Sequence, residues 1–327
     1  MIALVGATVS FEEGSELLAE LAGISVPAKS LERAAEALGR EIQHDELEQT
    51  QREDRGTIPS TLYIGLDGTG IPMRREEVRD RSGKQPDGSS RTREVKLCTV
   101  WSAEGRDENG VPIRDPGSVT YTAGIESAAS SDTADEPSVF AQRVLREAKR
   151  RGFFEAKRQV AIGDGAAFIW NTVDELFPNA IQIVDRFHVH QHLHDVAKAI
   201  FGPESDLCIP WAARRCDELN KGKLDLLIER LEIHASTCEE ARKCAGYIQR
   251  NRHRMRYDIF HARGLCTSSG VVEAGCKVAI GTRLKRAGMH WSLDGANAII
   301  ALRCAKLSNR LEPFWQRRSA PSRSQAA

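Results

Sequence analysis

The sequence contains no long hydrophobic run and no closely paired cysteines. No apolar stretch approaches the roughly 18 residues that span a bilayer, so we expect no membrane partner. The N-terminal sequence Met-Ile-Ala-Leu-Val lacks the basic region and the cleavage site of a signal peptide, which predicts a cytoplasmic protein. None of the eight cysteines forms a Cys-x-x-Cys pair. This spacing argues against a zinc finger and a disulfide scaffold, and it predicts reduced cysteines.

The chain also lacks a net charge, but its charges are unevenly distributed. Residues 1–60 contain 12 acidic and 5 basic residues, whereas residues 241–327 contain 4 acidic and 17 basic residues. A basic segment attracts phosphate backbones whatever the average charge of the chain. The C-terminal part therefore favours a nucleic-acid partner, and a solvated basic face is the alternative.

The order of apolar patterns predicts an α/β fold, a mixed sheet flanked by helices. Three segments are typical of strands and a fourth is typical of a small edge strand: Thr61–Leu66, Ile71–Arg74, Val95–Ala103 and Tyr121–Gly124. After Pro137, helices alternate with strands at 159–163 and 180–184.

Helical periodicity dominates the rest of the chain. Residues 10–40 predict two short helices around a turn at Gly23, a possible helix-turn-helix. A long helix is expected from near Val271, and another from Trp291 to Leu311. We expect five segments: a helical N-terminal region (1–56), the first part of the core (57–200), a helical insertion (201–262), the return of the core (263–312) and a disordered tail (313–327).

Three acidic residues stand beside predicted buried elements. Asp67 and Asp164 each end a short apolar run that is typical of a buried strand, and each is followed by a glycine. Glu273 opens a stretch with helical periodicity. A single strand-Asp-Gly is usually a turn, but two of them together with a later Glu favour a site that converges on divalent cations.

Such carboxylates suit Mg²⁺, for which Mn²⁺ can substitute. Two ions about 3.5–4 Å apart activate a water molecule and stabilise the attacking and leaving oxygens of a phosphodiester. The three acids therefore predict chemistry on phosphodiester bonds.

The motifs around these acids have a specific pattern. They are Leu66-Asp67-Gly68-Thr69, Gly163-Asp164-Gly165-Ala166, Val184-Asp185-Arg186-Phe187-His188 and Ser269-Gly270-Val271-Val272-Glu273, followed by Lys277, Arg283, Lys285 and Gly288-Met289-His290-Trp291. Over roughly residues 57–312 the chain resembles DDE insertion-sequence transposases of the ISKra type, which are related to Mutator-like elements. The resemblance implies a ribonuclease H-like core in which Asp67, Asp164 and Glu273 are catalytic and hold the metal.

Asp185 is the alternative second acid, because it also follows a predicted buried strand. We favour Asp164 because it follows the strand directly after the first long helix, as the ribonuclease H-like order requires. The resemblance then implies that Asp185 and His188 lie beside the site. There His188 could orient the phosphate or transfer a proton near neutral pH.

Histidines at positions 188, 190, 192 and 194 form two pairs spaced four residues apart. Such pairs can bind Zn²⁺ on one face of a helix. Neither pair encloses a Glu that could act as the base of a zinc protease, so a polar helix flank is favoured and a zinc hydrolase is the minor alternative.

Basic residues near Glu273 predict a DNA-binding surface. They are Arg250, Arg252, Arg254 and Arg256 before the return to the core, and Lys277, Arg283, Lys285 and Arg286 after Glu273. Trp291 is either buried or able to stack on an unpaired base at a transposon end.

Together these features predict a nucleoid-associated DNA transposase that acts as a homo-oligomer on transposon ends and target DNA. It would use Mg²⁺ to cleave at the ends and transfer the exposed 3′-hydroxyl into the target. The alternative is a DNA-binding remnant that lacks end recognition and transposition activity, because only about 60 residues precede the first acidic strand.

Overall fold

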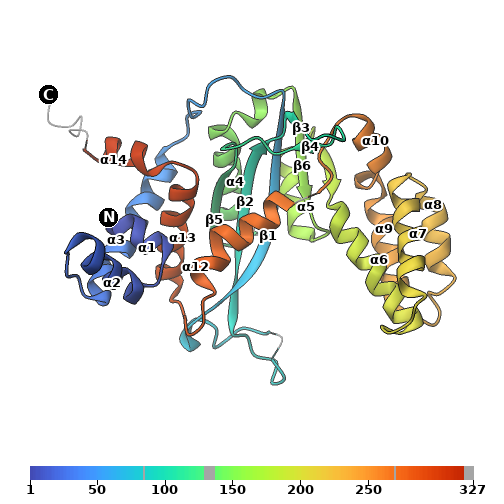
Figure 1. The fold of residues 1–327 in the computed structure, drawn as a ribbon, viewed down its shortest axis with the longest axis horizontal. Coiled ribbons are helices and arrows are strands. Elements are labelled where there is room, and N and C mark those ends of the chain that lie inside the picture. The colour runs from blue at the N-terminus through green and yellow to red at the C-terminus, as the bar shows by residue number, and fades with distance from the viewer. Residues whose placement is uncertain (84, 129–136, 269, 320–327) are drawn as a thin grey trace.

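The computed structural model describes residues 1–83, 85–128, 137–268 and 270–319. A central sheet separates two helical parts, with the chain's N- and C-terminal helices on one side and a helical insertion on the other (Figure 1). In this part of the chain no helix combines the length and the apolar character needed to cross a membrane.

The sheet is five-stranded and mixed. Its strands, in spatial order, are β5 (Thr120–Gly124), β2 (Thr92–Ser102), β1 (Thr61–Pro72), β6 (Arg158–Gly163) and β7 (Ile181–Val184). The first three are antiparallel neighbours, and β6 and β7 run parallel to β1. The predicted fold class, a ribonuclease H-like mixed sheet flanked by helices, is confirmed.

One strand prediction is wrong. Ile71 and Pro72 belong to β1 and do not begin a separate strand, because β1 stays paired with β2 from Leu62 to Pro72 without interruption. The segment 120–124 is the edge strand β5. A small separate hairpin joins β3 (Gly105–Arg106) to β4 (Pro112–Ile113).

The two faces of the sheet are covered by different helices. Alternate side chains of a strand point to opposite faces. Leu97 and Thr99 lie against Gly275 at the end of α11 (Gly270–Gly275). Cys98 and Val100 point the other way, into a core shared with α4 (Val139–Arg150) and α5 (Ala167–Leu176). A short 3-10 turn, Phe153–Glu155, follows α4.

The N-terminal helices pack on the C-terminal part of the chain. They are α1 (Ile2–Thr8), α2 (Phe11–Ala22) and α3 (Ala28–Glu48), and their partner is α13 (Leu293–Leu307). A Cβ at Gly39 of α3 would lie 2.1 Å from the Ala298 carbonyl oxygen, so glycine permits this close approach of two helices. Ser10 and Glu13 form a capping box that begins α2.

The C-terminal prediction needs a correction. The expected helix from Trp291 begins at Leu293, where Ser292 caps it, and ends at Leu307. A further helix, α14 (Leu311–Ser319), follows, so residues 313–319 are not a disordered tail. Residues 320–327 lie outside the described residues.

The insertion is helical, as its lack of strand pattern predicts. It follows α6 (Arg186–Phe201) and contains α7 (Cys208–Asn220), α8 (Leu224–Glu232), α9 (Glu239–Asn251), a 3-10 turn at Arg252–Arg254 and α10 (Tyr257–Ala262). The chain then returns to the sheet in α11. The long helix expected there is interrupted by a π-helical segment, Cys276–Gly281, before α12 (Thr282–Leu284). Such π-helical turns are often found at functional sites.

Candidate active site

Strand register places Asp67 and Asp164 side by side. In the parallel pair β1–β6, Gly65 is opposite Ile162, and each aspartate lies two residues further along its strand direction. Neighbouring strands lie about 4.8 Å apart. The two carboxylates therefore stand on adjacent strands toward the carboxyl end of the parallel pair, where ligands commonly bind in α/β sheets.

The third aspartate lies one strand further away. Gly163 is opposite Val184 in the parallel pair β6–β7, so Asp185 stands next to Asp164 and not next to Asp67. Asp185 is 5% exposed, and its Oδ1 accepts the Phe187 N–H at 2.8 Å as the N-cap of α6. This arrangement supports Asp164 over Asp185 as the partner of Asp67.

Glu273 belongs to a helix that lies directly on β1. A Cβ at Gly65 would come within 2.1 Å of the Val272 side chain, so the close approach of α11 depends on glycine at this position. Glu273 follows Val272, and its side chain is exposed. The charge of Glu273 contributes to raising the pKa of Asp67, which places the two carboxylates in one electrostatic site.

The ionised form of Asp67 is disfavoured in this site. Burial is the largest cause of its raised pKa, and the charges of Asp164 and Glu273 act in the same direction. Two hydrogen bonds oppose the rise, one from the Cys276 thiol and one from the Gly68 N–H at 2.7 Å. A carboxylate that burial and like charges destabilise gains from a nearby cation.

The donor set fits a hard divalent cation. Asp67 and Asp164 are partly buried, and Asp164 uses Oδ1 to accept the Ala166 N–H at 2.8 Å. Carboxylate oxygens are the ligands that Mg²⁺ and Mn²⁺ take. In the described ranges, no group of three or more His, Cys, Asp or Glu side chains already has the spacing of a metal site. Asp67, Asp164 and Glu273 are not such a group in this conformation, and their role as the residues that would hold the cation stays a prediction.

A tyrosine from the helical insertion covers the second aspartate motif. Tyr247 of α9 packs over Gly165, where a Cβ would lie 2.1 Å from its ring and 2.8 Å from its hydroxyl oxygen. This oxygen is buried and has no hydrogen-bond partner among the described residues. Burial and then the charge of Asp164 raise the pKa of Tyr247. This contact could not be predicted from the sequence, because it joins residues more than 80 positions apart.

Two histidines of α6 form a chain of ring contacts with this tyrosine. The His188 ring is 4.6 Å from the His192 ring, which in turn is 5.3 Å from the ring of Tyr247. Burial lowers the pKa of His192 and also that of His190, whose Nε2 lies 3.2 Å from the amide oxygen of Asn220. Among the described residues no third ligand joins either pair, so the geometry does not favour the zinc alternative.

Two residues predicted to bind DNA are instead buried. Arg283 has no exposed surface, donates through Nε to the Gly6 carbonyl at 3.0 Å, and lies over the rings of Phe11 and Trp291. Trp291 is 6% exposed and donates to the Leu284 carbonyl at 3.0 Å. Both residues stabilise the contact between α12 and the N-terminal helices. Neither side chain is exposed to DNA in this conformation, and of the two alternatives for Trp291 the structure shows the buried one.

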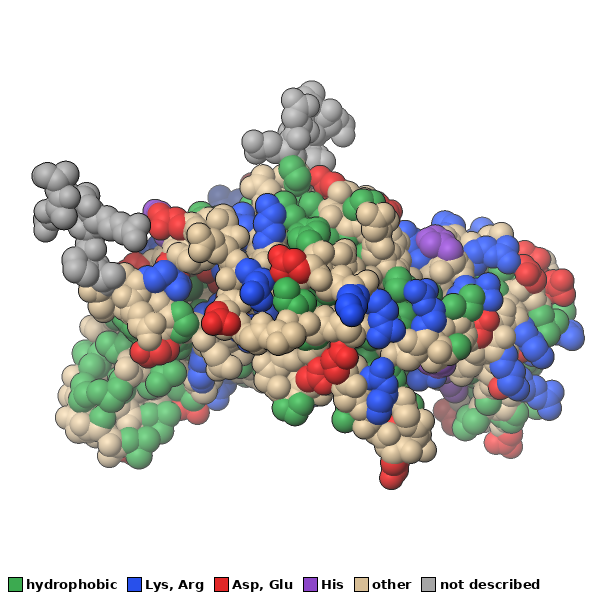
Figure 2. All heavy atoms as spheres, turned by 90° about the horizontal axis from the view of Figure 1, so that it is seen from above, with side chains coloured by type: hydrophobic (Ala, Val, Ile, Leu, Met, Phe, Trp, Pro, Cys, Tyr) green, Lys and Arg blue, Asp and Glu red, His purple; other side chains and the backbone are tan. Residues whose placement is uncertain are grey.

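Ion pairs neutralise several of the other predicted cations. Arg252 pairs with Asp225 at 2.7 Å, Arg256 with Asp258 at 2.9 Å and Arg286 with Glu13 at 2.5 Å. Arg254 stacks on Trp170, hydrogen-bonds Gln182 and lies 3.5 Å from Asp174. Figure 2 shows Lys and Arg side chains interspersed with Asp and Glu on one face of the molecule.

Besides the buried Arg283, three exposed cations of the predicted set have no carboxylate partner in the part of the chain described. Arg250 and Lys277 are exposed, and Lys285 donates through Nζ to the Thr69 hydroxyl at 2.5 Å. Thr69 lies two residues after Asp67 on β1. The contact with Thr69 therefore holds Lys285 two residues along β1 from Asp67.

Comparison with known proteins gives structural similarity at low sequence identity. No protein-family model matches the chain, and no curated protein matches it. The chain is similar to a solved structure, the "Drosophila P element transposase strand transfer complex", with 12% sequence identity and a TM-score of 0.31 over 98% of this chain and 80% of that chain. At this identity and TM-score the similarity carries no argument about function, which must rest on the site itself.

Proposed function

We propose that the protein is a metal-dependent DNA transposase of the DDE type. The observation that carries the proposal is the register of β1 and β6, which sets Asp67 beside Asp164, with the Glu273 helix packed on the same strand. The motifs around these residues, which resemble those of insertion-sequence transposases, support the same conclusion.

We assign separate roles to the metal-holding acids, a phosphate-binding lysine and a tyrosine that covers the site. Asp67, Asp164 and Glu273 would hold Mg²⁺ or Mn²⁺, which when bound supplies an activated water and stabilises the attacking and leaving oxygens. Lys285, held at Thr69, is placed to hold a phosphate of the DNA backbone near these acids. Tyr247 covers the Asp164 motif and limits the access of water on that side.

The reaction would proceed in two steps. In the first, a water oxygen forms a bond to the phosphorus at the transposon end, and the bond from phosphorus to the 3′-oxygen breaks, leaving a 3′-hydroxyl. In the second, the oxygen of this 3′-hydroxyl forms a bond to a target phosphorus and the bond from that phosphorus to the target 3′-oxygen breaks, while the proton of the attacking hydroxyl passes through solvent to the leaving oxygen. We propose that a homo-oligomer holds the two ends and the target DNA.

Purified protein is expected to nick a terminal-repeat duplex, taken from the DNA that flanks the gene, in the presence of Mg²⁺ or Mn²⁺. The triple variant Asp67→Asn, Asp164→Asn, Glu273→Gln should have no nicking activity on a denaturing gel. Full activity of the triple variant would overturn the proposal.

The N-terminal helices support a second candidate function, that of a DNA-binding remnant without end recognition. The α2–α3 pair has the helix-turn-helix order, but α3 packs on α13. On α3, Asp45 and Glu41 form ion pairs with Arg317 and Arg318 of α14. An acidic helix of this kind is a poor reader of DNA. Gel shifts that show equal affinity for terminal repeats and random duplex, together with no nicking, would favour the remnant.

A further inference from the structure

The connection between β1 and β2 forms an arm that carries six arginines. We call residues 72–83 and 85–93 the arginine arm. β6 pairs with β1 only as far as Gly65, and β5 pairs with β2 only from Lys96 onward. Beyond these points the two strands continue as a ribbon that extends from the sheet and ends in a loop (Figure 1). The arginines are Arg74, Arg75, Arg79, Arg81, Arg91 and Arg93.

The arginines of the arm are free of carboxylate partners, unlike most of the C-terminal cations. None of the six forms an ion pair within 4.0 Å, or a side-chain hydrogen bond, with the described residues. Five are exposed, and the sixth, Arg93, is half-buried with an unpartnered Nε. Burial and the charge of Arg81 lower the pKa of Arg93. The charge of Glu77 acts in the opposite direction, but no described carboxylate lies within ion-pair distance of the six guanidinium groups.

Two acidic side chains of the arm accept hydrogen bonds from backbone N–H groups. Glu77 accepts the Leu293 N–H at 2.9 Å, which ties the arm to the start of α13. Asp87 accepts the Ser89 N–H at 3.0 Å within the loop. The arm's other two acidic residues are Glu76 and Asp80. None of the four carboxylates forms an ion pair with an arginine of the arm, so the guanidinium groups remain available to a ligand.

The base of the arm is fixed relative to the acidic site. Met73 and Val78 are buried in the core shared with α13, and the Arg74 N–H donates to the Trp291 carbonyl at 2.9 Å. Arg74 follows Asp67 by seven residues along an almost fully extended chain, a span of ~20 Å. At 3.4 Å per base pair, this span corresponds to ~6 base pairs of duplex.

We propose that the arginine arm binds the phosphate backbone of duplex DNA about six base pairs from the phosphate at the acidic site. This proposal rests on the proposed function, because it takes DNA as the substrate of Asp67 and Asp164. Unpaired guanidinium groups in a fixed array match the regular spacing of backbone phosphates and bind them through paired N–H donors. The arm supplies affinity and alignment and does not touch the reacting atoms.

The test compares two triple variants of the full chain in EDTA, where no metal-dependent cleavage occurs. The arm variant is Arg74→Ala, Arg81→Ala, Arg91→Ala. The control, Arg40→Ala, Arg242→Ala, Arg318→Ala, removes three exposed arginines that already pair with carboxylates. Each duplex affinity is measured by fluorescence anisotropy across a range of salt concentrations.

The arm variant is expected to bind duplex at least about tenfold more weakly, and its log–log salt slope should fall by about 2–3 because each lost phosphate contact contributes about 0.9. The control should keep the wild-type slope. On a duplex carrying the cut site, hydroxyl-radical protection about six base pairs from the cut should be lost only in the arm variant. Equal slopes for the arm variant and the wild type would overturn the proposal. Because binding is measured without metal, a failure to nick DNA would count against the proposed function and not against the arm.

Discussion

Asp67→Asn is expected to abolish DNA cleavage while leaving the folded protein at least as stable as the wild type. The loss of a charge that stabilises the transition state costs on the order of 10²–10³ in rate, and removal of a metal-holding carboxylate should cost at least as much. Stability should not fall, because burial and the charges of Asp164 and Glu273 disfavour the ionised carboxylate. Asparagine keeps the side-chain oxygen that accepts the Gly68 N–H.

The raised pKa of Asp67 determines how the stability difference between Asp67→Asn and the wild type changes with pH. Because the pKa of Asp67 is raised above its ordinary value of 3.8 in the folded state, the folded protein binds a proton more readily than the unfolded chain. The ionised carboxylate therefore destabilises the fold at neutral pH, and this penalty is relieved as the pH falls from the raised pKa toward 3.8. Thermal unfolding should show Asp67→Asn equal to or above the wild type at pH 7.5, with a difference that shrinks near pH 4. A variant less stable than the wild type at pH 7.5 would contradict this electrostatic account.

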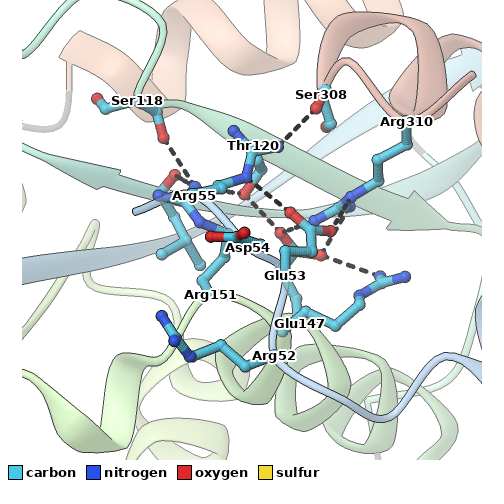
Figure 3. A network of polar contacts seen from close by, with 12 residues as sticks. Arg52, Glu53, Asp54, Arg55, Ser118, Thr120, Glu147, Arg151, Ser308 and Arg310 are labelled. Atoms are coloured by element: carbon cyan, nitrogen blue, oxygen red, sulfur yellow. Dashed lines mark hydrogen bonds and ion pairs between the residues drawn. The ribbon is translucent and has the colours of Figure 1, made fainter. Parts of the chain in front are cut away.

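Glu147→Ala is expected to destabilise the protein by about 3–5 kcal/mol, the cost of leaving buried cations without their partner. Glu147 is fully buried on α4 and accepts hydrogen bonds from Arg310 at 2.8 and 2.9 Å, from Arg150 at 3.0 Å and from Thr120 at 2.5 Å. Arg310 also pairs with Glu53 at 2.5 Å. Figure 3 shows how this network joins α4, β5, the segment after α3 and the start of α14.

Urea unfolding measures the change in free energy, and a double-mutant cycle identifies its cause. Glu147→Met with Arg310→Met should recover part of the loss, because it removes the uncompensated charge of Arg310 and leaves only that of Arg150. Burial alone would raise the pKa of Glu147, but the charges of Arg310 and Arg150 outweigh it and lower the pKa overall. The stabilisation is therefore present above the ordinary value of 4.5 and is lost as the pH falls below it. A loss under about 1 kcal/mol for Glu147→Ala would show that the network contributes little.

The sequence was sufficient for the strands but not for all of their limits. Apolar runs before Asp67 and Asp164 identify β1 and β6 because buried strands require them. One strand was predicted to end at Leu66 and a second to begin at Ile71, but pairing with β2 holds the chain extended from Leu62 to Pro72. Local propensity cannot include the partner strand, and for this reason the second predicted strand was wrong.

The predicted site could be located in part. Asp67 and Asp164 follow from strand order, which the sequence carries, and their adjacency follows from register, which it does not. Arg283 was indistinguishable in the sequence from an exposed cation, although it is buried against Phe11 and Trp291. Tyr247 could not be predicted, because tertiary packing alone brings it to Gly165.

Counts of charged residues along the sequence could not show which cations are paired in the folded protein. The basic C-terminal segment and the acidic N-terminal segment looked independent, but the structure joins them through pairs such as Arg286 with Glu13 and Arg317 with Asp45. Six arginines without a carboxylate partner lie instead in the arm between β1 and β2. Only the pairing in the folded state distinguishes a cation that binds DNA from one that holds two helices together.

The most direct test of the central claim compares nicking by Asp164→Asn and Asp185→Asn. The two variants are matched: each loses one negative charge at the end of a parallel strand, and each keeps an oxygen for its backbone bond, to the Ala166 N–H or the Phe187 N–H. On a terminal-repeat duplex with Mn²⁺, Asp164→Asn should lose all detectable nicking, whereas Asp185→Asn should lose less than about tenfold. Loss of activity in Asp185→Asn with retention in Asp164→Asn would contradict the pairing of Asp67 with Asp164 on which this account depends.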